Sequence, residues 1–266
     1  MLLDKQCKKR SVELLSGYKR FFMETIKKLN EQQVLNFDTD YIRDEDWDKL
    51  CEYLWKLFPE GNFNFLDIGG GNGVFCDKVL DTFLQSKAVL LDNSEYLISL
   101  NKQSGRKRII CASVEEIDKL FQGEAFDVVF LNLVLHHFVS NGYKSTYKNV
   151  KDTFLKLKPL LSSKGYVYVF EDFYNGLIFD GLPSHLIFTL TSSKMLAGLT
   201  RKLGANTGGI GVCFRSKKQW EKIINECGYR IIHEGKSIEF NEFPLYKRLL
   251  LHLGKVNMGY MWLKKE

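Results

Sequence analysis

The residues best suited to chemistry lie in the string FNFLDIGGGNGVF, residues 63–75. Asp67 follows an apolar run, and Gly69, Gly71 and Gly73 come after it at every second position. Glycine has no side chain, so the backbone at these positions can approach a ligand that other residues would keep away. The string therefore predicts a strand, a tight turn and a binding site for a nucleotide-like cofactor.

The spacing of the glycines does not match the dinucleotide-binding fingerprint GxGxxG. Counted from Gly69, that pattern needs Gly or Ala at a position where the chain has Val74. The carboxylate of Asp67 would repel a pyrophosphate and favours a cofactor that carries positive charge beside the turn. S-adenosylmethionine, with its ammonium and sulfonium groups, has that charge. The alternative is an α/β domain that uses the glycines for a tight turn and binds nothing.

A regular alternation of strand and helix patterns surrounds this turn. Five short apolar runs are typical of strands, and apolar residues at helical spacing lie between them. This alternation indicates parallel βαβ units, whose ligand sites open at the carboxyl ends of the strands. The expected strands are NFLDI, AVLLD, RIICAS, AFDVVFLN and YVYVFEDF, and the expected helices lie near 74–86, 95–104, 114–121 and 145–157.

The rest of the chain is divided around this α/β core. Residues 1–60 show helical patterns and are expected to form an N-terminal helical cap on a domain of residues 61–266. About 40 residues, 173–212, interrupt the alternation and are expected to form a helical lid. Ser216 and Gln219 then predict the capping box of a further helix. Two final strands, YRIIHEG and MGYMWLKK, are separated by a second insertion around PLYKRLLLHLGK.

Both insertions leave alternatives open. In the first, Leu182, Leu186 and Leu190 recur at four-residue steps, so the segment is expected to line an apolar acceptor pocket or to form a homodimer interface. The second, PLYKRLLLHLGK, is expected to pack as a helix whose lysines reach solvent. Contact with a membrane surface or with a lipid-like substrate is the alternative for this second insertion.

Composition sets the broad class of the protein. Its 266 residues are 45% hydrophobic and 26% charged, as in soluble globular proteins, and the net charge of +6 permits anionic ligands without requiring them. The six cysteines are scattered, with the nearest pair 14 residues apart, so neither a metal site nor a redox pair is expected. Charges interrupt the N-terminus and the apolar stretch 176–199. We therefore expect a cytoplasmic protein without a membrane span.

Residues 60–265 resemble the class I S-adenosylmethionine-dependent methyltransferases, most specifically in the string LDIGGGNG. The resemblance implies an α/β, Rossmann-like sheet of seven strands, mostly parallel, with an antiparallel last strand. It also implies that Asp67 holds the methionine ammonium of the cofactor, directly or through water. Gly69, Gly71 and Gly73 would form the turn beneath that ammonium.

The same resemblance assigns residues at the ends of the next three strands. Asp92, 25 positions after Asp67, matches the acidic residue that accepts both ribose hydroxyls, and Asn93 then lies near the adenine. Ser113 stands where the family commonly has an acidic residue that reads the adenine amino group. Asn132 and Leu133 match positions near the methionine portion. The prolines of the Asn-Pro-Pro-Tyr loop of amino-group methyltransferases do not follow Asn132, so we do not expect a nucleic acid acceptor.

Side chains after the fourth and fifth strands are the candidates for catalysis. Methyl transfer is an in-line displacement, so the enzyme chiefly aligns the reactants and excludes water, and a base is needed only when the nucleophile holds a proton. His136 and His137 are the candidate bases, with His137 preferred. Glu171 and Asp172 could orient or deprotonate the substrate, and a helix cap or a salt bridge is their alternative role.

We therefore expect a methyltransferase that converts S-adenosylmethionine to S-adenosylhomocysteine and methylates a small, partly apolar metabolite, as in natural-product biosynthesis. The histidines favour O-methylation over N- or C-methylation. Tyr18, Tyr174 and His185 are candidates to close over the methyl group, with ordinary packing as the alternative. Two other functions stay open: an RNA or protein methyltransferase that docks through its basic N-terminal segment, and a non-catalytic scaffold that binds the cofactor.

Overall fold

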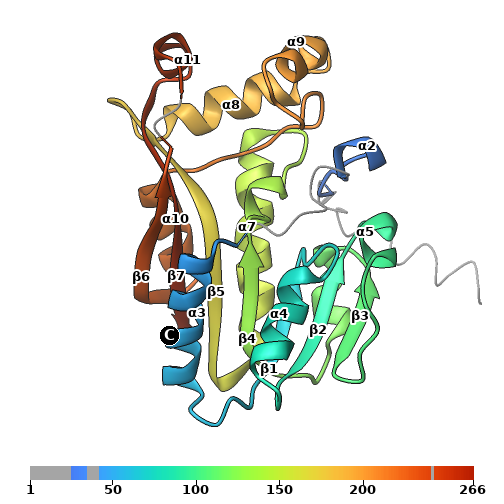
Figure 1. The fold of residues 1–266 in the computed structure, drawn as a ribbon. Helices are drawn as coiled ribbons and strands as arrows, with labels where there is room; N and C mark the ends of the chain where they lie inside the picture. Colours follow the sequence, from blue (N-terminus) through green and yellow to red (C-terminus); the bar gives the residue numbers. More distant parts are fainter. Residues whose placement is uncertain (1–24, 35–41, 241–242) are drawn as a thin grey trace, which may run out of the picture.

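The computed structural model describes residues 25–34, 42–240 and 243–266, and these contain one seven-stranded sheet (Figure 1). The strands are β1 (Asn64–Ile68), β2 (Lys87–Asp92), β3 (Lys107–Cys111), β4 (Phe126–Asn132), β5 (Leu161–Gly176), β6 (Tyr229–Glu239) and β7 (Leu253–Lys265). Their order is β3-β2-β1-β4-β5-β7-β6. Strands from β3 to β5 pair in parallel, whereas β7 runs antiparallel to both β5 and β6. The expected Rossmann-like sheet with an antiparallel last strand is confirmed.

Helices cover both faces of this sheet (Figure 1). Within the described ranges they are α2 (Glu31–Val34), α3 (Asp44–Leu57), α4 (Val74–Thr82), α5 (Glu95–Ser99), α6 (Ile117–Leu120), α7 (Tyr143–Leu157), α8 (Leu182–Ser192), α9 (Ala197–Lys202), α10 (Lys217–Glu226) and α11 (Leu245–Leu250). Side chains of α3 and α4 pack on one face, and those of α6, α7 and α10 on the other. Figure 1 shows α8, α9 and α11 together at one end of the molecule, beyond the edge of the sheet.

Alternation along the central strands explains why both faces need helices. In β4, Val129 and Leu131 belong to the core beneath α7 and α10, whereas Val128 and Phe130 belong to the core beneath α3 and α4. A parallel strand that is covered on both faces reads as a nearly continuous apolar run, as in FDVVFLN. Because β1, β2, β4 and β5 are parallel, their carboxyl ends meet at one edge of the sheet.

The element order confirms the expected alternation, with differences at the boundaries. The helix expected near 95–104 ends at Ser99 in α5, and the helix expected near 114–121 begins as a 3-10 turn before α6. β5 is longer than YVYVFEDF because its antiparallel pairing with β7 continues to Gly176. The capping box of Ser216 and Gln219 at the start of α10 is confirmed.

The insertions fold as helices beyond the carboxyl edge of the parallel strands. Residues 173–212 begin within β5 and then form α8 and α9, and the second insertion forms α11. The expectation that the apolar residues of α11 are packed is wrong, because no residue of this helix is buried. Tyr18 and the basic N-terminal segment lie outside the described residues. In the part of the chain that the structure describes, no helix has the length and apolar character needed to cross a membrane.

Candidate active site

The turn between β1 and α4 has the backbone that its glycines predict. Gly69, Gly71 and Gly73 have φ values of 73°, 54° and 81°, in the left-handed region that residues with a Cβ disfavour. A Cβ on Gly69 would lie 2.4 Å from Cγ2 of Val134, which follows β4. The left-handed conformation therefore favours glycine at all three positions, and close packing adds to this restriction at Gly69.

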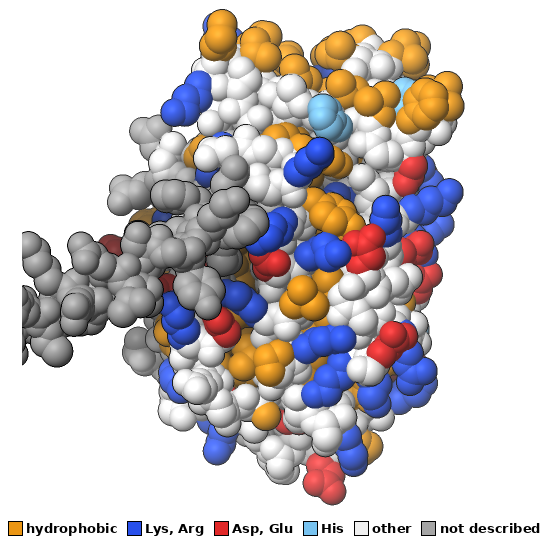
Figure 2. Space-filling model, turned by 180° about the vertical axis from the view of Figure 1, so that it is seen from behind, with side chains coloured by type: hydrophobic (Ala, Val, Ile, Leu, Met, Phe, Trp, Pro, Cys, Tyr) orange, Lys and Arg blue, Asp and Glu red, His pale blue; other side chains and the backbone are white. Residues whose placement is uncertain are grey.

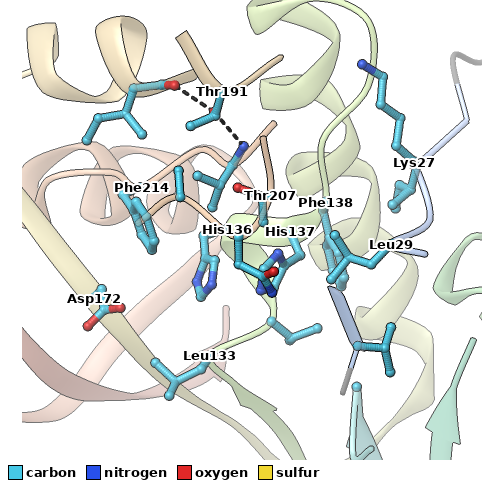
Figure 3. Close-up of a pocket in the computed structure, with 18 of the residues that line it drawn as sticks. Lys27, Leu29, Leu133, His136, His137, Phe138, Asp172, Thr191, Thr207 and Phe214 are labelled. Carbon is cyan, nitrogen blue, oxygen red and sulfur yellow. Dashed lines mark hydrogen bonds between the residues drawn. The ribbon is translucent and has the colours of Figure 1, made fainter. Parts of the chain in front are cut away.

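A cavity of about 640 Å³ opens at the carboxyl ends of β1, β2, β4 and β5. Ligand pockets typically have volumes of roughly 300–1,000 Å³, so this cavity is large enough for a cofactor. The glycine turn and the strand ends line it from the sheet, and residues of segment 25–34, α8, α9 and α11 line it from outside the sheet. In Figure 3, His136 and His137 lie between Lys27 and Leu29 on one side and Phe214 on the other.

Asp92 links the end of β2 to the glycine turn. Its Oδ2 accepts the N–H of Gly71 at 3.1 Å, and its Oδ1 accepts the N–H of Ser94 at 2.8 Å. Burial raises the pKa of Asp92, and these backbone hydrogen bonds oppose the shift. Asp92 and Asn93 both line the cavity, as the predicted contacts with the ribose and the adenine require.

Asp67 lies beneath the turn and does not line the cavity. It is 1% exposed, and neither carboxylate oxygen has a hydrogen-bond partner among the described residues. The carboxylate lies against the turn, since a Cβ on Gly70 would be 2.6 Å from Oδ2. Burial and then the nearby Asp92 raise the pKa of Asp67 to about 8, although Lys107 lowers it. This position allows Asp67 to act on a ligand's charge through the turn or through water.

Asn132 brings an amide to the cavity wall. It ends β4 and is 4% exposed, and neither its Nδ2 nor its Oδ1 has a partner among the residues that the structure describes. Leu133 follows with a φ of 49° and donates its N–H to the carbonyl of Phe170. Buried amides are normally hydrogen-bonded. The unpartnered amide of Asn132 therefore indicates a polar ligand in the cavity.

A buried pair positions the histidines that follow β4. Nδ1 of His136 lies 2.7 Å from Oε2 of Glu171, and Oε1 of the same carboxylate accepts the N–H of Leu135 at 2.7 Å. Burial lowers the pKa of His136, but the charge and the hydrogen bond of Glu171 outweigh it, so the pKa lies above 6.5. His136 lines the cavity, whereas Glu171 is fully buried behind it. Glu171 thus fixes the orientation of the His136 ring.

His137 and Asp172 line the same cavity but differ in charge behaviour. The ring centroids of His136 and His137 are 4.2 Å apart, and burial and then His136 lower the pKa of His137 well below 6.5. Burial also raises the pKa of Asp172 to about 6, with His136 opposing the shift and Glu171 adding to it. Oδ1 of Asp172 has no partner within the described part of the chain. Above pH 6 the cavity therefore contains an ionised carboxylate beside His136.

Of the remaining predicted residues, one lines the cavity and two do not. Tyr174 lines the cavity and stacks on Phe214, with 4.4 Å between the ring centroids. Ser113 does not line it, because its hydroxyl accepts the N–H of Glu115 at the start of a 3-10 turn. His185 is exposed and outside the cavity.

Part of the wall was not predicted from the sequence. Lys27 and Leu29 line the cavity from segment 25–34, Phe214 lines it from the loop before α10, and Tyr246 and Leu250 line it from α11. These residues are far from the strand ends in sequence, and no local motif marks them. The many apolar residues of PLYKRLLLHLGK were the one signal in the sequence that α11 contributes to the cavity wall.

Three comparisons with known proteins agree with this architecture. Residues 66–169 match the family model described as "Methyltransferase domain". Malonyl-(acyl-carrier protein) O-methyltransferase 2 of Ilyobacter polytropus is 35% identical over 71 residues, which are 26% of this chain and 27% of that protein. Isoflavone 7-O-methyltransferase of Glycyrrhiza echinata is 24% identical over 174 residues, which are 64% of this chain and 42% of that protein. The chain thus spans less than half the length of these curated relatives.

Among solved structures, the plantazolicin methyltransferase BpumL, in complex with a triazolic desmethylPZN analog and SAH, has the same fold. Its TM-score is 0.54 at 17% identity, and the match covers 88% of this chain and 89% of that one. The matched family segment begins within β1 and ends within β5, so it contains the glycine turn, Asp92 and Asn132. Residues 66–169 are therefore similar to a methyltransferase domain, and the chain has the Rossmann-like fold that the sequence predicts.

Proposed function

We propose that the chain is an S-adenosylmethionine-dependent methyltransferase. The observation that carries the proposal is the meeting of three features on the wall of one cavity: the glycine turn, Asp92, and the buried, unpartnered amide of Asn132. All three lie in residues 66–169, the segment that matches the methyltransferase domain model, and this match supports the same class of reaction.

The residues of the wall fit the parts of this cofactor. A carboxylate has about four lone-pair sites, so Asp92 can accept ribose hydroxyls while it holds the N–H groups of Gly71 and Ser94. Asn93 and Ala112 would border the adenine. The amide of Asn132 would bond the polar methionine portion, and the carboxylate of Asp67 beneath the turn favours an ammonium above it.

Side chains of the cavity wall then deprotonate the acceptor. When bound, the cofactor supplies a sulfonium methyl group that an acceptor nucleophile takes by in-line displacement. We assign the general base to His136 rather than to His137, because an imidazole whose pKa lies well below 6.5 is a weak base. Glu171 holds Nδ1 of His136, which leaves Nε2 to receive the proton of an acceptor hydroxyl. Asp172, ionised above about pH 6, favours the imidazolium that this transfer creates.

The acceptor is proposed to be a small, partly apolar metabolite that is methylated on oxygen. Apolar side chains of the insertions line the cavity beyond the histidines, among them Ile187, Leu190, Val212 and Phe243. The curated relatives named above are O-methyltransferases, which supports the choice of oxygen. A natural-product pathway and a cytoplasmic location are part of the proposal, and the five cysteines within the described ranges are free thiols, as is usual in a reducing compartment.

Calorimetric titration with S-adenosylhomocysteine tests the cofactor assignment. We expect saturable binding by the full chain, and Asp92→Ala should weaken it by about 1.5–3 kcal/mol, because hydrogen bonds to a charged group are lost. Glu60→Ala, which removes an exposed carboxylate far from the cavity, is the matched control. Binding of a nicotinamide dinucleotide in place of S-adenosylhomocysteine would overturn the proposal, and an unchanged affinity of Asp92→Ala would remove the ribose assignment.

A further inference from the structure

Three segments beyond the sheet expose large apolar side chains at one end of the molecule. We define the tip as residues 177–179 after β5, residues 194–203 with α9, and residues 245–250 of α11. The exposed fractions in the tip reach 96% at Met195, 75% at Ile178 and 71% at Leu245. The other exposed apolar residues there are Leu177, Phe179, Leu199, Leu203, Tyr246, Leu249 and Leu250. Figure 2 shows hydrophobic side chains in two groups at this end, with basic side chains beside them.

Hydrogen bonds join the three segments into one surface. Nζ of Lys247 in α11 donates to the carbonyl of Leu203 at 3.2 Å, which ties α11 to the end of α9. Nε2 of His252 accepts the N–H groups of Ile178 and Phe179, each at 2.9 Å, which ties the first segment to the chain after α11. The exposed side chains therefore lie on segments that are joined at one end of the molecule, whereas single exposed apolar residues are common on any protein.

Most of the charged side chains around this patch are positive. The stretches 181–215 and 243–254 contain no Asp or Glu, although Asp180 directly precedes the first and Glu242 directly precedes the second. The cations of the tip are Lys194, Arg201, Lys202, Lys247 and Arg248, and none forms an ion pair with another described residue. Apolar side chains bordered by unpaired cations match the interface of an anionic bilayer, where the apolar groups enter the acyl boundary and the cations meet the headgroups.

A second copy of the chain fits this surface less well. A twofold interface sets the same patch of both copies face to face, so the five cations, which have no ion-pair partner among the described residues, would meet five like charges. None of the described helices is long and apolar enough to cross a membrane. A peripheral position on the bilayer satisfies both the apolar side chains and the cations.

We propose that the tip is a docking surface for membranes that contain anionic phospholipids. Leu203, Tyr246 and Leu250 are 50%, 60% and 65% exposed and also line the cavity, so the cavity reaches the surface within the tip. Docking sets this opening against the bilayer. The inference goes beyond the proposed methyl transfer and does not depend on it.

Vesicle co-sedimentation of the full chain tests the docking surface. The probes are vesicles of phosphatidylcholine with phosphatidylglycerol and vesicles of phosphatidylcholine alone, each at low and at high salt. We expect binding to the anionic vesicles that salt weakens, and a loss of about tenfold or more in Leu249→Glu, whose side chain does not line the cavity. Leu84→Glu is the matched control, because Leu84 is 71% exposed but lies between α4 and β2, at the opposite edge of the sheet.

The charges are tested in the same assay. Lys202→Glu should weaken binding to anionic vesicles about fivefold or more, whereas Lys164→Glu, which reverses an exposed charge away from the tip, should have little effect. Equal losses in the tip variants and their controls would overturn the proposal, as would an absence of vesicle binding. Concentration-dependent dimerisation that Leu249→Glu abolishes, without vesicle binding, would assign the tip to a second copy. S-adenosylhomocysteine titrations of the same variants separate this outcome from a failure of the proposed function.

Discussion

Asp67 is fully buried and, with a pKa of about 8, is mostly protonated at neutral pH. Its pKa in the folded chain lies above the 3.8 of an ordinary carboxyl group. The folded state therefore binds the extra proton, and the stability that this group contributes is complete below pH 3.8 and is lost as the pH rises through about 8. A cation above the glycine turn would lower this pKa and release the proton.

We predict that the binding of S-adenosylhomocysteine at pH 7 releases up to about one proton from Asp67. The observed binding enthalpy should then differ between buffers of different ionisation enthalpy. Asp67→Asn should abolish the difference, because an amide has no proton to release. Glu60→Asn is the control for a general effect of charge. Equal enthalpies in all buffers for the unaltered chain would contradict the prediction.

The pKa of His136 depends on Glu171, and this dependence is measurable without an acceptor. In the unaltered chain, NMR titration of the His136 ring should give a pKa above 6.5, and in Glu171→Gln the pKa should fall because only the weaker effect of Asp172 then opposes burial. The pair stabilises the fold fully below pH 6.5, and this contribution fades as the pH rises through the raised pKa.

A control separates this effect from a change of fold. Asp118→Asn removes a largely exposed carboxylate of α6 that does not line the cavity, and it should leave the titration of His136 unchanged. A structural role for Glu171 alone would lower the melting temperature of Glu171→Gln without moving the pKa of His136. An unmoved pKa would therefore also remove the assignment of His136 as the base.

The positions of individual site residues could be predicted where these residues lie at the ends of parallel strands. Asp92, Asn93 and Asn132 end or follow parallel strands, and the shared edge of the sheet brings them to one cavity. Ser113 also follows a strand, but its hydroxyl caps the next turn, a local competition that the strand pattern does not reveal. The order of preference between His136 and His137 depends on Glu171, 35 residues away, and is a property of the fold.

At the scale of elements, the turn between β1 and α4 allows one position to be changed without a clash. The nearest atom to a Cβ on Gly71 is Cδ1 of Leu97 at 3.5 Å, whereas Gly69 and Gly73 have no such room. Gly71→Ala should therefore fold at a cost of about 1–2 kcal/mol for its left-handed backbone. Because Gly71 lines the cavity, the added methyl group should also weaken S-adenosylhomocysteine binding about tenfold.

Gly123→Ala is the matched control for this turn. Gly123 has a φ of 81°, as left-handed as the turn glycines, and nothing lies within 4 Å of a Cβ there. It should lose a similar free energy of unfolding, measured by urea denaturation, and keep its affinity for S-adenosylhomocysteine. Equal affinities of the two variants would mean that Gly71 does not face the ligand.

The lengths of elements were less predictable than their order. β4 was recognisable as FDVVFLN because burial on both faces makes it apolar throughout. β5 was expected to end near Phe173, but it continues to Gly176 because β7 returns beside it. Pairing between strands that are about 80 residues apart is set by the sheet, and the local sequence of either strand does not contain it.

At the scale of the whole molecule, the periodicity of apolar residues predicted a sheet with helices on both faces. It did not predict how α8, α9 and α11 are arranged at one end of the molecule. Helices of the core bury a stripe of apolar residues, which their sequence displays. α11 buries none, so its pattern cannot tell a packed helix from an exposed one. Lys247 of α11 contacts Leu203, so this hydrogen bond joins the two insertions. The sequence of one insertion does not predict its contact with the other.

The packing of Val134 against Gly69 has a consequence for how this chain can change. The loop after β1 and the loop after β4 touch here, with no room for another methyl group. A residue larger than glycine at 69 demands a smaller one at 134, and a bulkier branch at 134 would push the two strand ends apart. Substitutions at these positions should therefore arise together among related sequences, as a linked pair that sets the distance between the carboxyl ends of β1 and β4.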